Sequence, residues 1–401
     1  MALLLDTRLL TRKIKDLRNV TPKRHKVKEK WAATRVKYPP SILALRHFDS
    51  TYSIQLGKLW PSVRVALLSE RKYGALLNNF AHHAVLTDLD AQGCCRDFIG
   101  DAYTQIQPCL EKESEVVAEE ESISVSTKKS DSDSQQPSPL QLSLNIKCLV
   151  FPRGDITKFK PARPDTKRLL SHYLMDAASV LPCLALNVRG GHNVLDLCAA
   201  PGGKALALLQ THSIGFLCVN DNSASRTTRL RKVLQSYIPK ELLTDEKIRI
   251  TSFDGTQWGQ IERNTFDRVL VDVPCTTDRH SLMEDDNNIF SKNRTGERRR
   301  LPEVQTELLL AGILAACRGG EILYSTCTLS QIQNMSVVEQ AIYLAKENHG
   351  IQLQVVDLRA LTQMFRKTFD FAPDLPLGEM VIPHLAANFG PIYMCKLRRI
   401  T

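Results

Sequence analysis

Short apolar runs alternate with stretches of helical periodicity from residue 143 to residue 401. A bounded apolar run predicts a buried β-strand, and apolar residues recurring every three or four positions predict an amphipathic helix. Their alternation is typical of a mostly parallel sheet covered by helices on both faces, here with seven strands. The predicted strands are residues 194–198, 216–221, 248–251, 269–272, 321–324, 351–356 and 392–396, and the predicted helices are 204–210, 224–235, 302–316 and 330–347.

The segment 28–110 shows a different pattern, in which apolar residues recur mainly at helical spacing. It contains neither a glycine-rich loop nor an acid–base cluster, so we interpret it as a mainly helical extension used for docking or RNA contact. The residues at helical spacing are Leu59, Val63, Ala66 and Leu67, followed by Leu76, Leu77 and Phe80.

Residues 1–27 combine leucines at helical spacing with many basic residues, and their only acids are Asp6 and Asp16. A basic amphipathic helix that is poor in acids has the profile of a mitochondrial presequence. The alternative is a basic RNA-binding arm, and the two interpretations overlap because the basic character continues beyond residue 27.

Residues 111–142 are acidic and rich in serine, with too few apolar side chains to offset the cost of ordering. We therefore expect a disordered linker between the extension and a domain at 143–401.

Overall charge and composition narrow the class of protein. The net charge of +10 and the pI of about 9.0 favour an anionic partner such as nucleic acid, or else reflect a basic tail on a neutral enzyme. The 11 cysteines form no CxxC pair and show no Cys/His ligand spacing, which argues against a bound metal and for a reducing compartment. No apolar run approaches the roughly 18 residues of a membrane span, so we expect no membrane insertion.

The stretch from Asp196 to Lys204 reads DLCAAPGGK and joins the first predicted strand to a helix. Gly202 and Gly203 allow a backbone to come close to a ligand, and free amides at a helix start favour an anionic group. On its own, the Pro-Gly-Gly sequence also fits a simple turn.

Two further strand ends carry acids. Asp221 ends the second strand, where an acid usually binds ribose hydroxyls, and Arg226 follows in the next helix. Asp254 and Gly255 end the third strand, where the carboxylate can accept a hydrogen bond from an adenine amino group. Each acid alone is more often a helix cap or turn residue, but together they favour S-adenosylmethionine over a dinucleotide.

Two cysteines follow two other apolar runs, Cys275 in DVPC and Cys327 in STC. Thiolate attack makes an unreactive ring carbon nucleophilic, so two thiols aimed at one crevice indicate covalent chemistry on a ring. The alternative for either cysteine is a buried small apolar residue.

These motifs resemble the Nop/Sun-type RNA cytosine-5 methyltransferases, since Asp196–Lys204, Asp272–Cys275 and Ser325–Cys327 all match. Single-cysteine DNA cytosine methyltransferases have the Pro-Cys but lack the Thr-Cys. The resemblance implies a class I, Rossmann-like fold and S-adenosylmethionine as cofactor. It also implies that Cys327 attacks carbon 6 of the base, that Cys275 assists product release, and that Asp272 bonds the ring. We also expect Lys204 to make a second polar contact to base or cofactor.

Further stretches, such as Tyr173–Ser179 and Asn388–Pro391, resemble the mitochondrial branch that acts on small-subunit ribosomal RNA. That resemblance implies a location in the mitochondrial matrix, ribosomal RNA and mitochondrial ribosomal subunits as partners, and a role in mitoribosome assembly. It further implies a heterodimer with a helical-repeat protein of the mitochondrial termination-factor type. Transfer RNA methylation and a mainly non-catalytic assembly scaffold stay open as alternatives.

One departure from the family is Thr328, where many members have serine. Basic residues after Cys275 are candidates for phosphate contacts, with a solvated loop as the alternative. They are Arg279, His280, Arg294 and Arg298–Arg300.

Overall fold

The computed structural model describes residues 38–82, 94–104 and 143–401. The predicted presequence at 1–27 and the predicted linker at 111–142 lie outside the described residues. The described residues from 39 onward belong to one compact unit, which includes the N-terminal extension as far as it is described.

Among the described residues, the main sheet has nine strands: eight follow the order β11-β12-β13-β9-β8-β5-β6-β7, and β10 pairs with β13. Its centre is parallel, and β13 adds antiparallel to β9. The parallel strands are β5 (Asn193–Asp196), β6 (Phe216–Asn220), β7 (Ile248–Thr251), β8 (Phe266–Asp272) and β9 (Ala316–Thr326). The antiparallel strands are β10 (Leu353–Val356), β11 (Asp370–Phe371), β12 (Glu379–Ile382) and β13 (Ile392–Arg399).

The predicted α/β class is therefore confirmed, while the predicted number of seven strands is too low. The two additional strands are β11 and β12, which pair with each other and extend the sheet beyond β13. They were missed because β11 has only two residues and β12 follows a turn rich in proline.

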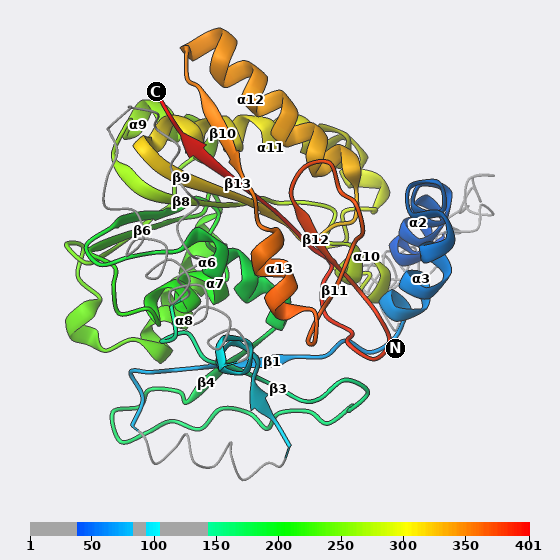
Figure 1. The fold of residues 1–401 in the computed structure, drawn as a ribbon, viewed down its shortest axis with the longest axis horizontal. Coiled ribbons are helices and arrows are strands. Elements are labelled where there is room, and N and C mark those ends of the chain that lie inside the picture. Colours follow the sequence, from blue (N-terminus) through cyan, green and yellow to red (C-terminus); the bar gives the residue numbers. More distant parts are fainter. Residues whose placement is uncertain (1–37, 83–93, 105–142) are drawn as a thin grey trace, which may run out of the picture. The chain divides into compact units, whose positions relative to one another are not determined.

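Helices cover both faces of the sheet, as Figure 1 shows. Alternate residues of one strand belong to two separate hydrophobic cores: Leu270 packs with α6 and α7, whereas Val269 and Val271 pack with α11 and α12. This alternation explains why the central strands are apolar throughout. The helices are α6 (Leu181–Leu186), α7 (Gly203–Leu209), α8 (Ala224–Tyr237), α9 (Trp258–Ile261), α10 (Asp278–Met283), α11 (Thr295–Ala315), α12 (Met335–His349) and α13 (Arg359–Phe365). Short 3-10 helices are η2 (Gly57–Leu59), η3 (Ala177–Val180), η4 (Lys240–Leu242), η5 (Gly255–Gln257), η6 (Lys292–Arg294) and η7 (Gln331–Gln333).

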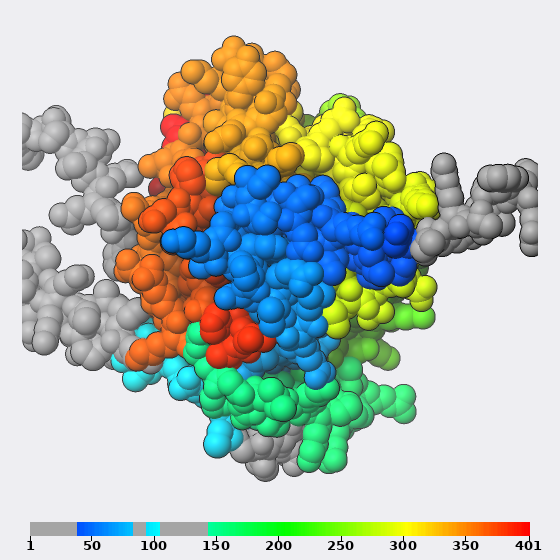
Figure 2. All heavy atoms as spheres, turned by 90° about the vertical axis from the view of Figure 1, so that its right-hand side faces the viewer, coloured from blue at the N-terminus to red at the C-terminus, as the bar shows by residue number. Residues whose placement is uncertain are grey.

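The described part of the N-terminal extension contains two helices at its start, α2 (Pro40–Leu56) and α3 (Trp60–Leu68), in agreement with the predicted helical character. Proline at the start of each helix suits the first turn, where a backbone N–H has no partner. Both helices pack on α10, and in Figure 2 they lie in blue across this face of the molecule. They bury aromatic side chains, including Phe48, Tyr52 and Trp60, in the same core as α11 and α12.

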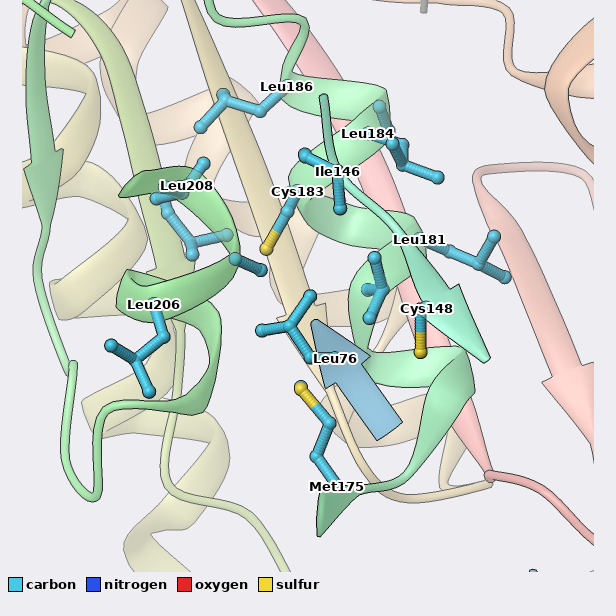
Figure 3. Packing of buried hydrophobic residues seen from close by; sticks show 14 of the residues in the cluster. Leu76, Ile146, Cys148, Met175, Leu181, Cys183, Leu184, Leu186, Leu206 and Leu208 are labelled. Atoms are coloured by element: carbon cyan, nitrogen blue, oxygen red, sulfur yellow. The ribbon is translucent and has the colours of Figure 1, made fainter. Parts of the chain in front are cut away.

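The helix predicted around Leu76, Leu77 and Phe80 was wrong. Residues Gly74–Leu77 form strand β1, which lies between β3 (Cys148–Val150) and β4 (His172–Met175), with β2 (Arg96–Asp97) at the edge. So short an apolar run fits either a helix or a strand, and pairing with distant strands decides between them. Leu76 and Cys148 of this small sheet belong to the same buried hydrophobic cluster as Leu181 of α6, and Figure 3 shows part of that cluster.

Candidate active site

The two cysteines lie just beyond the carboxyl ends of neighbouring strands. β8 and β9 are parallel, and Asp272 is in register with Ser325. Two loops of similar length then leave the sheet on the same edge, and the Sγ atoms of Cys275 and Cys327 are 3.3 Å apart. The backbone N–H of Asp278 donates to the carbonyl of Cys327 at 3.3 Å, so the loops are also joined through the backbone. The predicted convergence of the two thiols is what the structure contains.

The two thiols lie within hydrogen-bond distance of each other, and either sulfur can be the donor. A hydrogen bond from the Cys327 thiol lowers the pKa of Cys275, and the backbone N–H of Thr277 also donates to the Cys275 sulfur at 3.4 Å. Donation to Cys275, together with burial, holds the pKa of Cys327 well above its usual value. The Cys275 sulfur is therefore the first of the pair to become a thiolate, and it can accept the proton of Cys327.

Asp272 and Lys204 form a partly buried ion pair beside the thiols. The Lys204 Nζ donates to Asp272 Oδ2 at 2.8 Å, while the Ser325 hydroxyl donates to Asp272 Oδ1 at 2.7 Å. Burial opposes the charge on Lys204, but the carboxylate of Asp272 outweighs it and raises the pKa of the ammonium group. The two donors thus orient the carboxylate, whose side chain is 29% exposed.

Asp196, at the end of β5, is buried and both its carboxylate oxygens lack a hydrogen-bond partner. Burial, reinforced by the charge of Asp272, raises the pKa of Asp196 to about 8. Asp221, at the end of β6, is also buried; it accepts the backbone N–H of Ser223 and pairs with Arg226 at 3.2 Å. An unsatisfied buried carboxylate such as that of Asp196 calls for a ligand with hydrogen-bond donors or positive charge, and S-adenosylmethionine carries both.

The remaining predicted cofactor residues have structural partners. Arg226 donates to the carbonyl of Ala200 at 2.7 Å, which ties α8 to the loop after β5. Asp254 caps η5 by accepting from Thr256, and the start of η5 at Gly255 packs against α11. Their predicted contacts to the cofactor remain predictions.

Protein packing leaves little room for a side chain at either glycine of the Pro-Gly-Gly turn. Gly202 has φ +118°, and a Cβ there would lie 2.9 Å from Leu230 of α8. A Cβ at Gly203 would lie 3.0 Å from the ring of Tyr173. The turn therefore brings α7, α8 and β4 together. Close approach of its backbone to a ligand remains a prediction.

One positioning residue was not predicted from the sequence. It lies in the donor half of the site, which is the proposed cofactor-binding region at the ends of β5, β6 and β7. Asn220 is buried, donates to the carbonyls of Leu197 and Phe253, and accepts from Thr251 and from the Phe253 backbone. It fixes the loops that follow β5 and β7. Its place at the end of an apolar run, directly before Asp221, is the signal that could have identified it.

Arg279 was predicted to face RNA, and this prediction was wrong. Its guanidinium group is buried and donates to Gly390, Asn388 and Ala66. Arg294 pairs with Glu297, and Arg298 lies over the ring of Phe290. Arg299 and Arg300 are exposed, as a contact with phosphate groups requires.

Within the described ranges, no group of three or more His, Cys, Asp or Glu side chains could hold a metal ion. No helix in the part of the chain that the structure describes is long and apolar enough to cross a membrane.

The fold and the site together define a class I, S-adenosylmethionine-dependent methyltransferase. Residues 183–398, more than half of the chain, match the family described as 16S rRNA methyltransferase RsmB/F. The chain therefore belongs to the RsmB/F family of RNA cytosine-5 methyltransferases.

Full-length relatives agree with this assignment. The chain is 50% identical over 391 residues to the 5-cytosine rRNA methyltransferase NSUN4 of Xenopus laevis, covering 95% of this chain and 96% of that protein. It is 35% identical over 362 residues to the mitochondrial tRNA (cytosine(34)-C(5))-methyltransferase of Danio rerio, covering 89% and 87%. The solved structure of NSun6 from Pyrococcus horikoshii with SFG has the same fold, with a TM-score of 0.52, 15% identity, and coverage of 89% of this chain and 98% of that one.

Proposed function

We propose that this chain methylates carbon 5 of a cytosine in mitochondrial small-subunit ribosomal RNA through a covalent bond between Cys327 and the base. The observation that carries the proposal is the pair of thiols 3.3 Å apart beside the partly buried Asp272–Lys204 ion pair. The NSUN4 relative from Xenopus laevis, named for this reaction on ribosomal RNA, supports the substrate.

The reaction begins with Cys327, because cytosine carbon 5 is a poor nucleophile until a thiolate adds to carbon 6. Cys275, as the sulfur that ionises first, takes the Cys327 proton while the Cys327 sulfur bonds to carbon 6. The electrons of the carbon 5–carbon 6 double bond then become available at carbon 5. Asp272 holds the ring by accepting a hydrogen bond from its amino group, beside N3, where charge changes during attack.

S-adenosylmethionine supplies the electrophilic methyl group when bound. Asp196 and Asp221 would hold it through their buried carboxylates, beside the turn at Gly202 and Gly203. Cys275, 8% exposed, returns its proton to solvent and then removes the proton from carbon 5. The electrons of that carbon–hydrogen bond restore the ring double bond and expel the Cys327 thiolate, which frees the product.

The location and partners rest on sequence and resemblance. The basic amphipathic pattern of residues 1–27 and the mitochondrial relative from Danio rerio support a mitochondrial protein, which we place in the matrix. The resemblance to the mitochondrial branch supports a heterodimer with a helical-repeat protein of the termination-factor type and a role in mitoribosome assembly.

The test is bisulfite sequencing of mitochondrial RNA from cells that express either the wild type or Cys327→Ala. We expect one cytosine of the small-subunit ribosomal RNA to lose its mark with Cys327→Ala and to keep it with Cys148→Ala, which alters a buried cysteine of the small sheet. Loss of a mark in transfer RNA instead would support the second candidate, which the Danio rerio relative favours. If no cytosine changed, the assembly-scaffold alternative would replace both.

A further inference from the structure

The residues that directly follow the two thiols are joined through one buried carboxylate. Thr276 follows Cys275 and Thr328 follows Cys327, and each hydroxyl donates to Oδ1 of Asp278 at 2.7 Å. The two hydroxyl oxygens are also 2.8 Å from each other. A single carboxylate oxygen therefore holds the two loops that carry the sulfur atoms.

The second oxygen of Asp278 is also fully used. Its Oδ2 accepts the backbone N–H of Leu329 at 2.8 Å and the phenol hydroxyl of Tyr52 at 2.9 Å. Asp278 is 0% exposed, and the four groups that donate to it are uncharged. A buried carboxylate is stable only when hydrogen bonds replace the lost water, so the loss of one donor disturbs the other three.

Tyr52 is held firmly by the extension from which it comes. Its ring stacks on Phe48, with centroids 4.9 Å apart, and meets the edge of Trp60 at 5.5 Å. Arg279, the neighbour of Asp278, donates to the carbonyl of Ala66 near the end of α3. Two consecutive residues of α10 thus bind the two helices of the extension, one residue to each.

We propose that Tyr52 is a positioning residue for the methyl transfer, because through Asp278 it fixes the relative placement of the Cys275 and Cys327 loops. This inference rests on the proposed function, since it presupposes that both thiols react. It assigns the extension a part in completing the active site, in addition to any docking or RNA contact. Displacement of a reacting group by about 1 Å can cost ~100-fold in rate, so a small loop shift is enough to matter.

The test compares Tyr52→Phe with Tyr237→Phe in the full chain. Both remove a buried phenol hydroxyl and keep the ring, and Tyr237 donates to the carbonyl of His172, far from the Asp278 carboxylate in the hydrogen-bond network. We expect Tyr52→Phe to lower kcat about tenfold with an unchanged KM for S-adenosylmethionine, and Tyr237→Phe to retain wild-type kcat. The measurement is transfer of a radiolabelled methyl group to protein-free small-subunit ribosomal RNA from mitochondria that lack the enzyme.

A loss of stability is distinguished from a loss of positioning by two further measurements. Both variants lose one buried hydrogen bond, so their Tm values should fall by similar amounts. Thr328→Val should reproduce the kcat defect and Thr328→Ser should restore wild-type kcat, which keeps the test available if Tyr52→Phe does not fold. The proposal is overturned if Tyr52→Phe and Thr328→Val keep wild-type kcat, or if Tyr237→Phe loses as much. If the wild type labels no RNA, the proposed function fails instead.

Discussion

The donor half of the site lies at the ends of β5, β6 and β7, and the thiol half lies beyond β8 and β9. Their buried carboxylates differ in hydrogen bonding. Asp196, after β5, has no hydrogen-bond partner for either oxygen, whereas Asp278, beyond β8, accepts four donors. Both residues are almost inaccessible to solvent, at 1% and 0%. The difference therefore lies in partners and not in exposure. It indicates that the donor half is completed by its ligand, while the thiol half is assembled before the substrate arrives.

This difference suits the functions of the two halves, which are cofactor binding and thiol chemistry. A small cationic cofactor can supply donors to carboxylates that the protein leaves unsatisfied. Two sulfur atoms that must act in succession on one ring need fixed positions in advance, because preorganised groups cost little reorganisation during the reaction. The following substitutions separate these two halves.

The largest effect is expected for Asp272→Asn, which removes the charge at the boundary between the halves. Lys204 would lose its partner, and the base would lose a charged hydrogen-bond group. We expect kcat to fall by about 10²–10³-fold, measured by methyl transfer to ribosomal RNA. Asp267→Asn, at the amino-terminal end of the same strand, serves as a control expected to keep its activity. An unchanged kcat for Asp272→Asn would show that this carboxylate does not act on the base.

Asp196→Asn should act on the cofactor and leave the thiols unaffected. A hydrogen bond to a charged group contributes about 1.5–3 kcal/mol, so the KM for S-adenosylmethionine should rise roughly tenfold to a hundredfold. Covalent bonding of Cys327 to RNA should be retained, because the thiol half is already assembled. Loss of covalent bonding in this variant would break the distinction between the halves.

The same residue predicts a pH dependence of stability. In the folded, cofactor-free protein, burial followed by the charge of Asp272 raises the pKa of Asp196 from 3.8 to about 8. The folded state then holds a proton that the unfolded state has released, so this contribution is fully present below pH 3.8 and is lost as the pH rises through about 8. Relative to Asp196→Asn, the wild-type Tm should fall across that window, as differential scanning calorimetry can measure. Parallel curves for the two proteins would contradict this prediction.

The smallest effect is expected for Arg226→Met. The ion pair between Arg226 and Asp221 includes an arginine side chain that is 49% exposed, and such pairs contribute at most about 1 kcal/mol. We expect the KM for S-adenosylmethionine to rise less than about fivefold, with kcat unchanged, in steady-state kinetics. A fall in kcat would show that Arg226 affects the methyl-transfer step as well as cofactor binding.

Strand periodicity was enough to predict the main features of the site. Because the carboxyl ends of parallel strands share one edge, the positions of Asp272, Cys275 and Cys327 in the sequence were sufficient to bring them together. The same argument placed Asp196 and Asp221 on that edge. The placement of these residues follows from their position at the end of a nearby strand, and the pattern of apolar residues predicts that strand.

Features that depend on contacts between residues far apart in the chain could not be predicted from the sequence. Tyr52 reaches Asp278 across 226 residues, and only its helical spacing from Phe48 hinted at a buried face. Arg279 was misread as exposed, because burial of an arginine depends on carbonyl groups that other elements supply. Strand β1 was misread for the same reason, since its partners are β3 and β4.

The division of roles between the two thiols is tested most directly by trapping the protein–RNA adduct. Cys275→Ala, Cys327→Ala and the double variant are incubated with S-adenosylmethionine and unmethylated ribosomal RNA and then separated under denaturing conditions. If Cys327 forms the bond and Cys275 releases the product, Cys275→Ala alone should accumulate a slowly migrating covalent species. An adduct with Cys327→Ala, or none with Cys275→Ala, would contradict this account.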